Sequence, residues 1–201
     1  MVKSKLTGLF NVYNMLAAIS VAVAEGIGRQ DIQAALEEFD RVPGRFEKVE
    51  IDQPFTVIVD YAHTPDGLEN VLRTAKQFVQ GRLIAVFGCG GDRDRTKRPI
   101  MGELAVRYAD HVIVTSDNPR SEEPEFIIRQ IMEGIQSPES RSRTETITDR
   151  RTAIACALGM GRSGDVILIA GKGHENYQIL ADRTIHFDDR EVVRELAGGL
   201  K

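Results

Sequence analysis

Hydrophobic residues follow two different patterns along the chain, and the patterns meet near Arg41. Before that residue the apolar positions recur at helical spacing, and they predict two helices over residues 11–25 and 30–39, without a strand. After it, short continuous apolar runs alternate with helical segments. We therefore predict a domain boundary near Arg41, with a helical segment at residues 1–40 and a larger domain at residues 41–201.

The larger domain is predicted to alternate strands and helices. The sequence predicts strands at residues 45–51, 55–60, 83–87, 111–116, 144–148, 166–170 and 184–187. It predicts helices that begin at Pro65 and at residues 99–108, 124–135, 150–158 and 189–197. Continuous apolar strands between helices are typical of a parallel sheet that is covered on both faces. We expect an α/β fold, a Rossmann-like, mostly parallel sheet with helices on both faces, preceded by the short helical segment.

Composition indicates a packed, soluble protein. The 201 residues are 42% hydrophobic and 28% charged, which excludes wholesale disorder. The net charge of −4 and the dispersed basic residues disfavour nucleic-acid binding. The apolar stretch 15–24 is too short to span a bilayer, and no signal-peptide pattern follows Met1. Cys89 and Cys156 lie far apart without metal-ligand spacing, so we expect a cytoplasmic protein that binds no membrane.

Loops rich in glycine and charge directly follow four of the predicted strands. They span residues 60–65, 88–95, 116–120 and 171–175. In a mostly parallel sheet, ligands bind outside the carboxyl ends of the strands, because the loops there carry polar groups on a rigid frame. We therefore expect a binding site where these loops meet.

Each loop also has a purely structural interpretation. Asp60 could accept a turn hydrogen bond, and the glycines after residue 87 could allow a tight turn. Asn118-Pro119 is a common turn initiator, and Lys172 with Glu175 could form an exposed ion pair that contributes little. Considered separately, none of these loops establishes a function.

Together, the charged loop residues suit a zwitterion. The carboxylate of a free amino acid needs a guanidinium fork, and its ammonium needs carboxylates or carbonyl groups. Arg93 and Arg120 can supply the forks, while Asp117 and Glu175 can supply the acids. Asn118 can both donate and accept hydrogen bonds. This combination indicates a small substrate with both charges.

Other motifs do not indicate nucleotide or metal binding. The GxGxxG match at residues 159–164 follows a helix and precedes a strand, which is the reverse of the dinucleotide-binding context. The sequence contains no GxxxxGK[ST] phosphate loop. The histidines at 63, 111, 174 and 186 have no partner at metal-ligand spacing, so no intrinsic metal site is expected.

Several motifs, in order, resemble those of the Mur ligase family. They span residues 8–14, 43–47, 60–65, 88–98, 117–120, 171–175 and 187–191, and so extend over nearly the whole chain. More narrowly, they are similar to the branch that adds meso-2,6-diaminopimelate, because Asp117-Asn118-Pro119-Arg120 marks that branch and lysine-adding members depart from it. Arg120 is the group that the extra carboxylate of diaminopimelate needs.

The resemblance implies an ATP-dependent ligase that activates UDP-MurNAc-L-Ala-D-Glu as an acyl phosphate, which the amine of the amino acid then attacks. Residues 1–40 would be the helical end of a central ATPase domain, and residues 41–201 the C-terminal ligase domain. The phosphate loop, the Mg²⁺ ligands and a modified lysine would belong to other domains of the same enzyme. We therefore expect this chain to be inactive alone.

The resemblance also implies roles for individual residues. Diaminopimelate would contact Arg93, Asp117, Asn118, Pro119, Arg120, Gly171 and Glu175. ATP would lie near Asn11, Asn14, Arg45, Asp60 and His63. The chain would orient the substrate and supply no proton-transfer residue or metal ligand. Three alternatives remain at this point: a lysine-adding ligase, a folylpolyglutamate-type ligase, and a non-catalytic module that binds an amino acid or nucleotide.

Overall fold

The chain is divided into two compact units. The structure is a computed structural model that describes residues 3–6 and 8–199. Its internal contacts separate one unit that ends at Pro43 from a second unit that begins at Gly44. The assignment of the first unit to a central ATPase domain stays a prediction.

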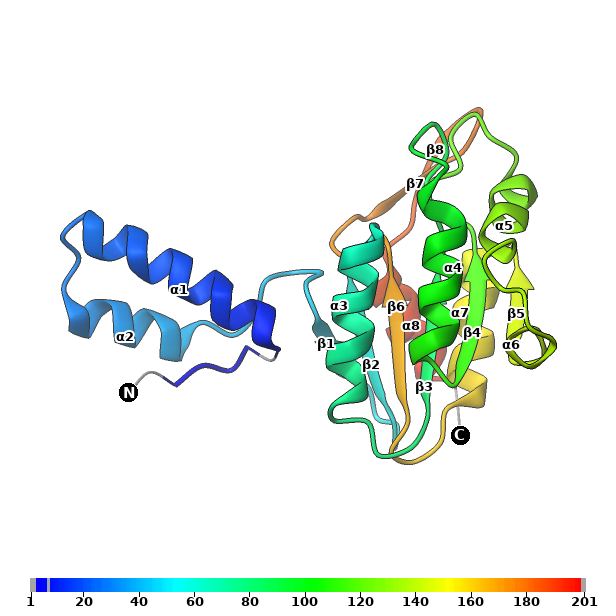
Figure 1. Ribbon diagram of the computed structural model, residues 1–201. Coiled ribbons are helices and arrows are strands. Elements are labelled where there is room, and N and C mark those ends of the chain that lie inside the picture. Colours follow the sequence, from blue (N-terminus) through cyan, green and yellow to red (C-terminus); the bar gives the residue numbers. More distant parts are fainter. Residues whose placement is uncertain (1–2, 7, 200–201) are drawn as a thin grey trace. The chain divides into compact units, whose positions relative to one another are not determined.

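The first unit is a pair of helices, α1 (Leu9–Ala24) and α2 (Arg29–Glu38), drawn in blue in Figure 1. Gly26 lies in the turn between them at a φ of 75°, a backbone conformation that favours glycine. No strand occurs among the described residues of this unit. Throughout the described part of the chain, no helix is both long and apolar enough to cross a membrane.

A six-stranded sheet forms the centre of the second unit (Figure 1). The strand order is β1-β2-β6-β3-β4-β5, and neighbouring strands are parallel except for β1, which is antiparallel to β2. The strands are Glu47–Val49 (β1), Thr56–Asp60 (β2), Leu83–Phe87 (β3), His111–Thr115 (β4), Thr144–Ile147 (β5) and Val166–Ala170 (β6). Because β6 lies between β2 and β3, the carboxyl ends of β2, β6, β3 and β4 follow one another along one edge.

Helices cover both faces of this sheet (Figure 1). One face packs against α3 (Pro65–Lys76), α4 (Lys97–Tyr108) and α5 (Pro124–Met132), and the other against α7 (Arg150–Met160) and α8 (Asp189–Ala197). Alternate residues of β3 belong to the two cores, with Ala85 and Phe87 in one and Ile84 and Val86 in the other. Every residue of β3 and β6 is buried, which explains their continuous apolar runs. The predicted α/β fold class is confirmed.

Side-chain caps begin two helices close after the strands that precede them. The Thr64 hydroxyl accepts a hydrogen bond from the Gly67 N–H at 3.2 Å, and Pro65 occupies the first helical position of α3. The Asp149 carboxylate accepts one from the Thr152 N–H at 2.8 Å at the start of α7. These caps keep the connecting loops short, so the loops stay at the edge of the sheet.

Two short elements were not predicted from the sequence. Strand β7 (Tyr177–Ile179) pairs with β8 (Thr184–His186) in an antiparallel hairpin, of which only the second strand was expected. Helix α6 (Pro138–Ser142) also forms in a segment for which no element was predicted. Elements of three to five residues contain too few positions to show a hydrophobic period. Whether they form depends instead on strand pairing, as for β7, or on helix capping, as for α6.

Candidate functional site

A cavity of about 480 Å³ lies at the carboxyl edge of the sheet, where the loops after β2, β6, β3 and β4 meet. The lining residues that the sequence had singled out are His63, Arg93, Asp117, Asn118, Arg120, Gly171 and Glu175, whereas Pro119 is not among the lining residues. The structure thus brings residues from four separate loops to one place. Tyr61, Thr64, Asp94, Thr96 and Lys97 also line the cavity, although the sequence had assigned them no contact with a ligand.

Asn118 is the best-anchored polar residue of the cavity, with only 2% of its surface exposed. Its side-chain amide donates to Glu175 Oε2 at 2.9 Å. Its side-chain oxygen accepts hydrogen bonds from the Ile179 N–H at 2.9 Å and from Lys172 Nζ at 3.3 Å. The run after β4 is therefore more than a turn, because Asn118 ties the β4 loop to the β6 loop and to strand β7.

Lys172 is completely buried and contacts two residues that line the cavity. Its ammonium contacts Glu175 Oε2 at 3.1 Å, Asn118 Oδ1 at 3.3 Å and the carbonyl oxygen of Tyr177. The interpretation of Lys172 and Glu175 as an exposed ion pair is wrong, because 0% of the lysine and 13% of the glutamate side chain is exposed. A buried ammonium needs such partners, and in return it fixes the orientation of the Glu175 carboxylate.

Asp117 lies against the β6 loop. Its Oδ1 accepts a hydrogen bond from the Asn118 N–H at 2.6 Å. A Cβ atom at Gly171 would lie 2.5 Å from Asp117 Oδ2, so glycine at position 171 allows the carboxylate to approach. Gly171 itself has a φ of 117°. The close approach of Asp117 explains why glycine occupies position 171, and it places the Asp117 carboxylate on the wall of the cavity.

Arg120 joins the β4 loop to the glycine-rich loop after β3. The Arg120 guanidinium donates a hydrogen bond to the Gly91 carbonyl at 2.9 Å, and the backbone N–H of Arg120 donates one to the Ile179 carbonyl at 3.1 Å. Its φ of 52° is unusual for a residue with a side chain. Arg93 lines the same cavity, and its guanidinium donates to the Asp92 carbonyl at 2.9 Å. Two guanidinium groups and the carboxylates of Asp117 and Glu175 therefore line one cavity.

A buried ion pair that the sequence did not indicate holds these two loops together. Arg98 is 0% exposed, and its two terminal nitrogens donate to the Glu122 carboxylate at 3.0 and 2.9 Å. Arg98 also donates to the Gly90 carbonyl at 3.1 Å, and Glu122 accepts a hydrogen bond from the Asp92 N–H at 2.6 Å. The hydrogen bonds from Arg98 lower the pKa of Glu122 to about 2.

The loop after β2 supplies the aromatic side of the cavity. The guanidinium of Arg45 lies 4.8 Å from the centre of the Tyr61 ring, with the rings of His63 and His174 at 4.7 and 5.0 Å. Lys97 donates to the His63 carbonyl at 2.6 Å. Arg45 and His63 are exposed, so their side chains are accessible to a ligand.

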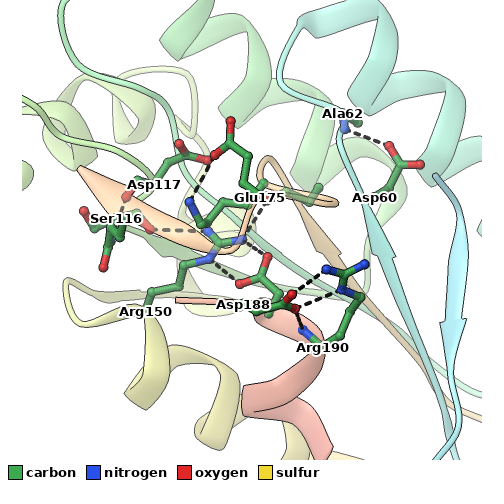
Figure 2. Close-up of polar contacts among 12 residues, drawn as sticks. Asp60, Ala62, Ser116, Asp117, Arg150, Glu175, Asp188 and Arg190 are labelled. Atoms are coloured by element: carbon green, nitrogen blue, oxygen red, sulfur yellow. Dashed lines mark hydrogen bonds and ion pairs between the residues drawn. The ribbon is translucent and has the colours of Figure 1, made fainter. Parts of the chain in front are cut away.

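Asp60 is buried beside this loop, and burial raises the pKa of its carboxyl group. Its oxygens accept hydrogen bonds from the Phe46 N–H at 2.6 Å and the Ala62 N–H at 2.7 Å. The bond to Ala62, which Figure 2 shows, is the turn that the structural interpretation of Asp60 predicted. Asp60 thus shapes the loop that carries Tyr61 and His63, and its contact with ATP stays a prediction.

The two other residues predicted to lie near ATP belong to the first unit. Asn11 is buried at the start of α1, and its side-chain oxygen accepts a hydrogen bond from Asn14 Nδ2 at 3.4 Å. Asn14 is exposed one turn later on the same helix. This hydrogen bond orients the Asn14 amide, and the predicted ATP contacts of both residues stay predictions.

Comparison with known proteins identifies the second unit. A family model described as "Mur ligase, glutamate ligase domain" matches residues 44–173. Two similar curated proteins are both named UDP-N-acetylmuramoyl-L-alanyl-D-glutamate--2,6-diaminopimelate ligase. The protein from Syntrophomonas wolfei is 58% identical over 199 residues, which is 99% of this chain and 40% of the relative. The protein from Geobacillus thermodenitrificans is 54% identical over 193 residues, 96% of this chain and 39% of the relative.

A solved structure supports the same relationship. It is described as the structure of a UDP-N-acetylmuramoyl-L-alanyl-D-glutamate--2,6-diaminopimelate ligase, with 44% sequence identity and a TM-score of 0.75. The match covers 98% of this chain and 40% of that chain. The chain thus spans about two fifths of the length of these relatives. Because the family model matches most of the chain, the chain belongs to the Mur ligase family.

Proposed function

We propose that this chain is the C-terminal part of an ATP-dependent ligase that adds meso-2,6-diaminopimelate to UDP-MurNAc-L-Ala-D-Glu, a step of peptidoglycan precursor synthesis in the cytoplasm. The observation that carries the proposal is the cavity in which Arg93, Arg120, Asp117 and Glu175 meet. The names of the relatives from Syntrophomonas wolfei and Geobacillus thermodenitrificans agree with it.

The charges of the cavity match those of the proposed amino acid. Diaminopimelate carries a carboxylate and an ammonium group at each end, whereas lysine lacks the second carboxylate. Arg93 and Arg120 provide guanidinium forks for carboxylates, and Asp117 and Glu175 provide acceptors for ammonium groups. Asn118 and Lys172 hold the Glu175 carboxylate in place before the substrate arrives. A site ordered in advance loses less free energy when it binds its substrate.

The residues of this chain would act by positioning. In the proposed reaction the amine of diaminopimelate attacks the carbonyl carbon of an acyl phosphate, a C–N bond forms, and inorganic phosphate leaves. Holding the amino acid by its charged groups fixes the direction of its reactive amine, and such orientation contributes to catalysis. We assign no proton-transfer residue to this chain.

We propose that the aromatic side of the cavity faces the nucleotide. Exposed Arg45 and His63 are suited to phosphate oxygens. Considered by itself, the first unit presents the exposed amide of Asn14, a group that can hydrogen-bond to a base. When bound, Mg²⁺ neutralises charge on the phosphates of ATP. In our proposal the remaining domains of the same enzyme hold the metal and supply the phosphate loop.

The test compares two amino acids in the complete ligase that carries these residues. We expect ATP consumption that depends on UDP-MurNAc-L-Ala-D-Glu and on meso-diaminopimelate, with little turnover of lysine. Equal turnover of both amino acids would contradict the proposed specificity. The absence of any turnover while the amino acid still binds would favour a binding module.

Substitution of Arg120 tests the role of the second carboxylate. Arg120→Ala should weaken diaminopimelate binding by about 2–5 kcal/mol and leave ATP binding unchanged, because only the amino acid would lose a charge partner. Arg107→Ala is a matched control, since Arg107 is 53% exposed on α4 and pairs with Glu103. A parallel loss of both affinities in Arg120→Ala would show a folding defect or a misplaced site.

A further inference from the structure

Residues 187–191 resemble a family motif, yet none of them lines the cavity. This segment links β8 to α8, and Asp188 begins the helix by accepting a hydrogen bond from the Arg190 N–H at 2.8 Å. The next residue, Asp189, is 0% exposed and accepts two hydrogen bonds at 2.8 Å from Arg150, the first residue of α7. The acidic motif therefore contains one half of a fully buried ion pair.

The other hydrogen bonds of Arg150 lie at the carboxyl ends of the two strands that carry the amino-acid loops. Figure 2 shows its guanidinium beside the backbone of Ser116, whose carbonyl accepts a hydrogen bond at 3.3 Å. The carbonyl of Ala170 accepts another at 3.1 Å. These carbonyls belong to the residues immediately before Asp117 and Gly171. Since β4 and β6 lie on either side of β3, Arg150 spans the carboxyl end of β3 and fastens the two loops to each other.

The charge of Arg150 lies beneath the acids of the cavity. Burial alone would lower its pKa, but the carboxylates of Asp189, Asp117 and Glu175 raise it, so the guanidinium stays charged. A planar guanidinium presents its donors in a fixed fork, which sets the spacing of everything it binds. The flexible, compact ammonium of a lysine would not hold two carbonyls and a carboxylate in the same arrangement.

Stability alone does not explain such a pair. Desolvation of two fully buried ions offsets much of their attraction, and well-packed apolar residues often replace them without loss of stability. The same two helices are also joined by Arg151 and Glu195, at 2.8 Å, with side chains 47% and 60% exposed. The two helices also share an apolar core that includes Ala157 and Val193, so their packing does not rest on the buried pair alone.

We propose that Arg150 and Asp189 form a positioning pair for the amino-acid site. The pair sets the distance between Asp117 and Gly171 and places a positive charge beneath the carboxylates that would receive the substrate ammonium groups. It touches neither substrate nor nucleotide. This inference rests on the proposed function, and it predicts that a change in the pair alters the KM for the amino acid and leaves the KM for ATP unaltered.

The experiment measures KM for meso-diaminopimelate, for ATP and for UDP-MurNAc-L-Ala-D-Glu in the complete ligase. Arg150→Lys keeps the charge and loses the fork, whereas the double variant Arg150→Met with Asp189→Leu replaces the pair by apolar side chains that favour folding. For both variants we expect the KM for diaminopimelate to rise about tenfold or more. The reason is that both lose the guanidinium hydrogen bonds to the carbonyl groups of Ser116 and Ala170. The other two KM values should stay within about twofold. Arg151→Lys, on the same helix, should change none of them.

Unfolding of a variant does not obscure the result, because KM is independent of the concentration of active enzyme, whereas the maximum rate falls with it. A diaminopimelate KM within about twofold of the unsubstituted enzyme in both variants would overturn the proposal and leave the pair a purely structural role. A parallel rise in all three KM values would overturn it as well. Failure of the proposed function is a distinct outcome, because the unsubstituted ligase would then show no turnover with diaminopimelate.

Discussion

The ion pair between Arg98 and Glu122 gives a prediction whose size follows from the structure. The pair joins the glycine-rich loop to the β4 loop, and the side chains are 0% and 8% exposed. Glu122→Gln keeps the shape of the side chain and removes its charge. Arg98 would then keep two neutral acceptors, the Gln130 side chain at 2.5 Å and the Gly90 carbonyl at 3.1 Å. A buried guanidinium without its carboxylate is costly, so the variant should be less stable.

The pKa of Glu122 sets the magnitude. It falls from an ordinary value of 4.5 to about 2 in the folded chain, chiefly through the hydrogen bonds from Arg98. By linkage this shift contributes up to about 3 kcal/mol to the free energy of unfolding at neutral pH. A lowered carboxyl pKa stabilises the fold above the unfolded value, and the contribution is lost as pH falls toward the folded value. The difference between the two proteins should therefore shrink by about 1 kcal/mol at roughly pH 4.

Urea unfolding of the chain, followed by far-ultraviolet circular dichroism at neutral pH and at about pH 4, measures both quantities. Glu103→Gln is the matched control, because Glu103 pairs with Arg107 at 2.6 Å on the surface of α4, where both side chains are more than half exposed. Its cost should be a few tenths of a kcal/mol. A Glu122→Gln cost that equals that of the control, or one that stays constant as pH falls, would refute this reasoning.

Two further predictions concern the backbone and the thiols. Gly44→Ala should destabilise the second unit by about 2 kcal/mol or more in urea unfolding, because Gly44 has a φ of 66° and a Cβ atom there would lie 2.0 Å from the His174 nitrogen. Gly164→Ala should lower the free energy of unfolding by only about 1–2 kcal/mol, because Gly164 has a φ of 84° but an added Cβ atom would lie 3.4 Å from its nearest neighbour. Equal costs for the two variants would exclude a steric clash at position 44. Burial raises the pKa of the Cys89 thiol to about 12, and it also raises that of the half-buried Cys156. At about pH 8 a thiol reagent should therefore modify Cys156 slowly and Cys89 only after unfolding, and rapid reaction of both native thiols would contradict this.

The fold was largely predictable because buried parallel strands have a direct signature. Residues 83–87 and 166–170 are apolar throughout, and the structure has strands β3 and β6 at those residues. Pro65 predicted the start of α3, because proline is favoured at the first helical position. Strand β7 gave no comparable signal, since Tyr177, Gln178 and Ile179 become a strand only by pairing with β8.

The loops of the site were predictable as a group, whereas their supports were not. Glycine and charge after each strand indicated where Arg93, Asn118 and Glu175 would gather, because parallel strands end at one edge. Lys172 was interpreted as an exposed ion-pair partner. Its burial depends on the β7–β8 hairpin, which the sequence did not predict as a whole and which places the Tyr177 ring 5.4 Å from the lysine ammonium. The flanking glycines at 171 and 173 were a usable signal, because both have positive φ and allow close backbone approach.

In the proposed site, buried residues hold the Asp-Asn-Pro-Arg run in position. Asn118 is fixed by Lys172, Arg120 by the Gly91 carbonyl, and the loop before them by Arg150. A guanidinium discriminates between diaminopimelate and lysine only if it is held where the second carboxylate would bind. A mobile arginine could turn toward water when the second carboxylate is absent, so lysine would bind almost as well. A protein that has the same four residues without the buried Lys172 and Arg150 should therefore bind diaminopimelate weakly and distinguish it poorly from lysine. In our proposal, specificity thus depends on buried cations as much as on the residues that would face the substrate.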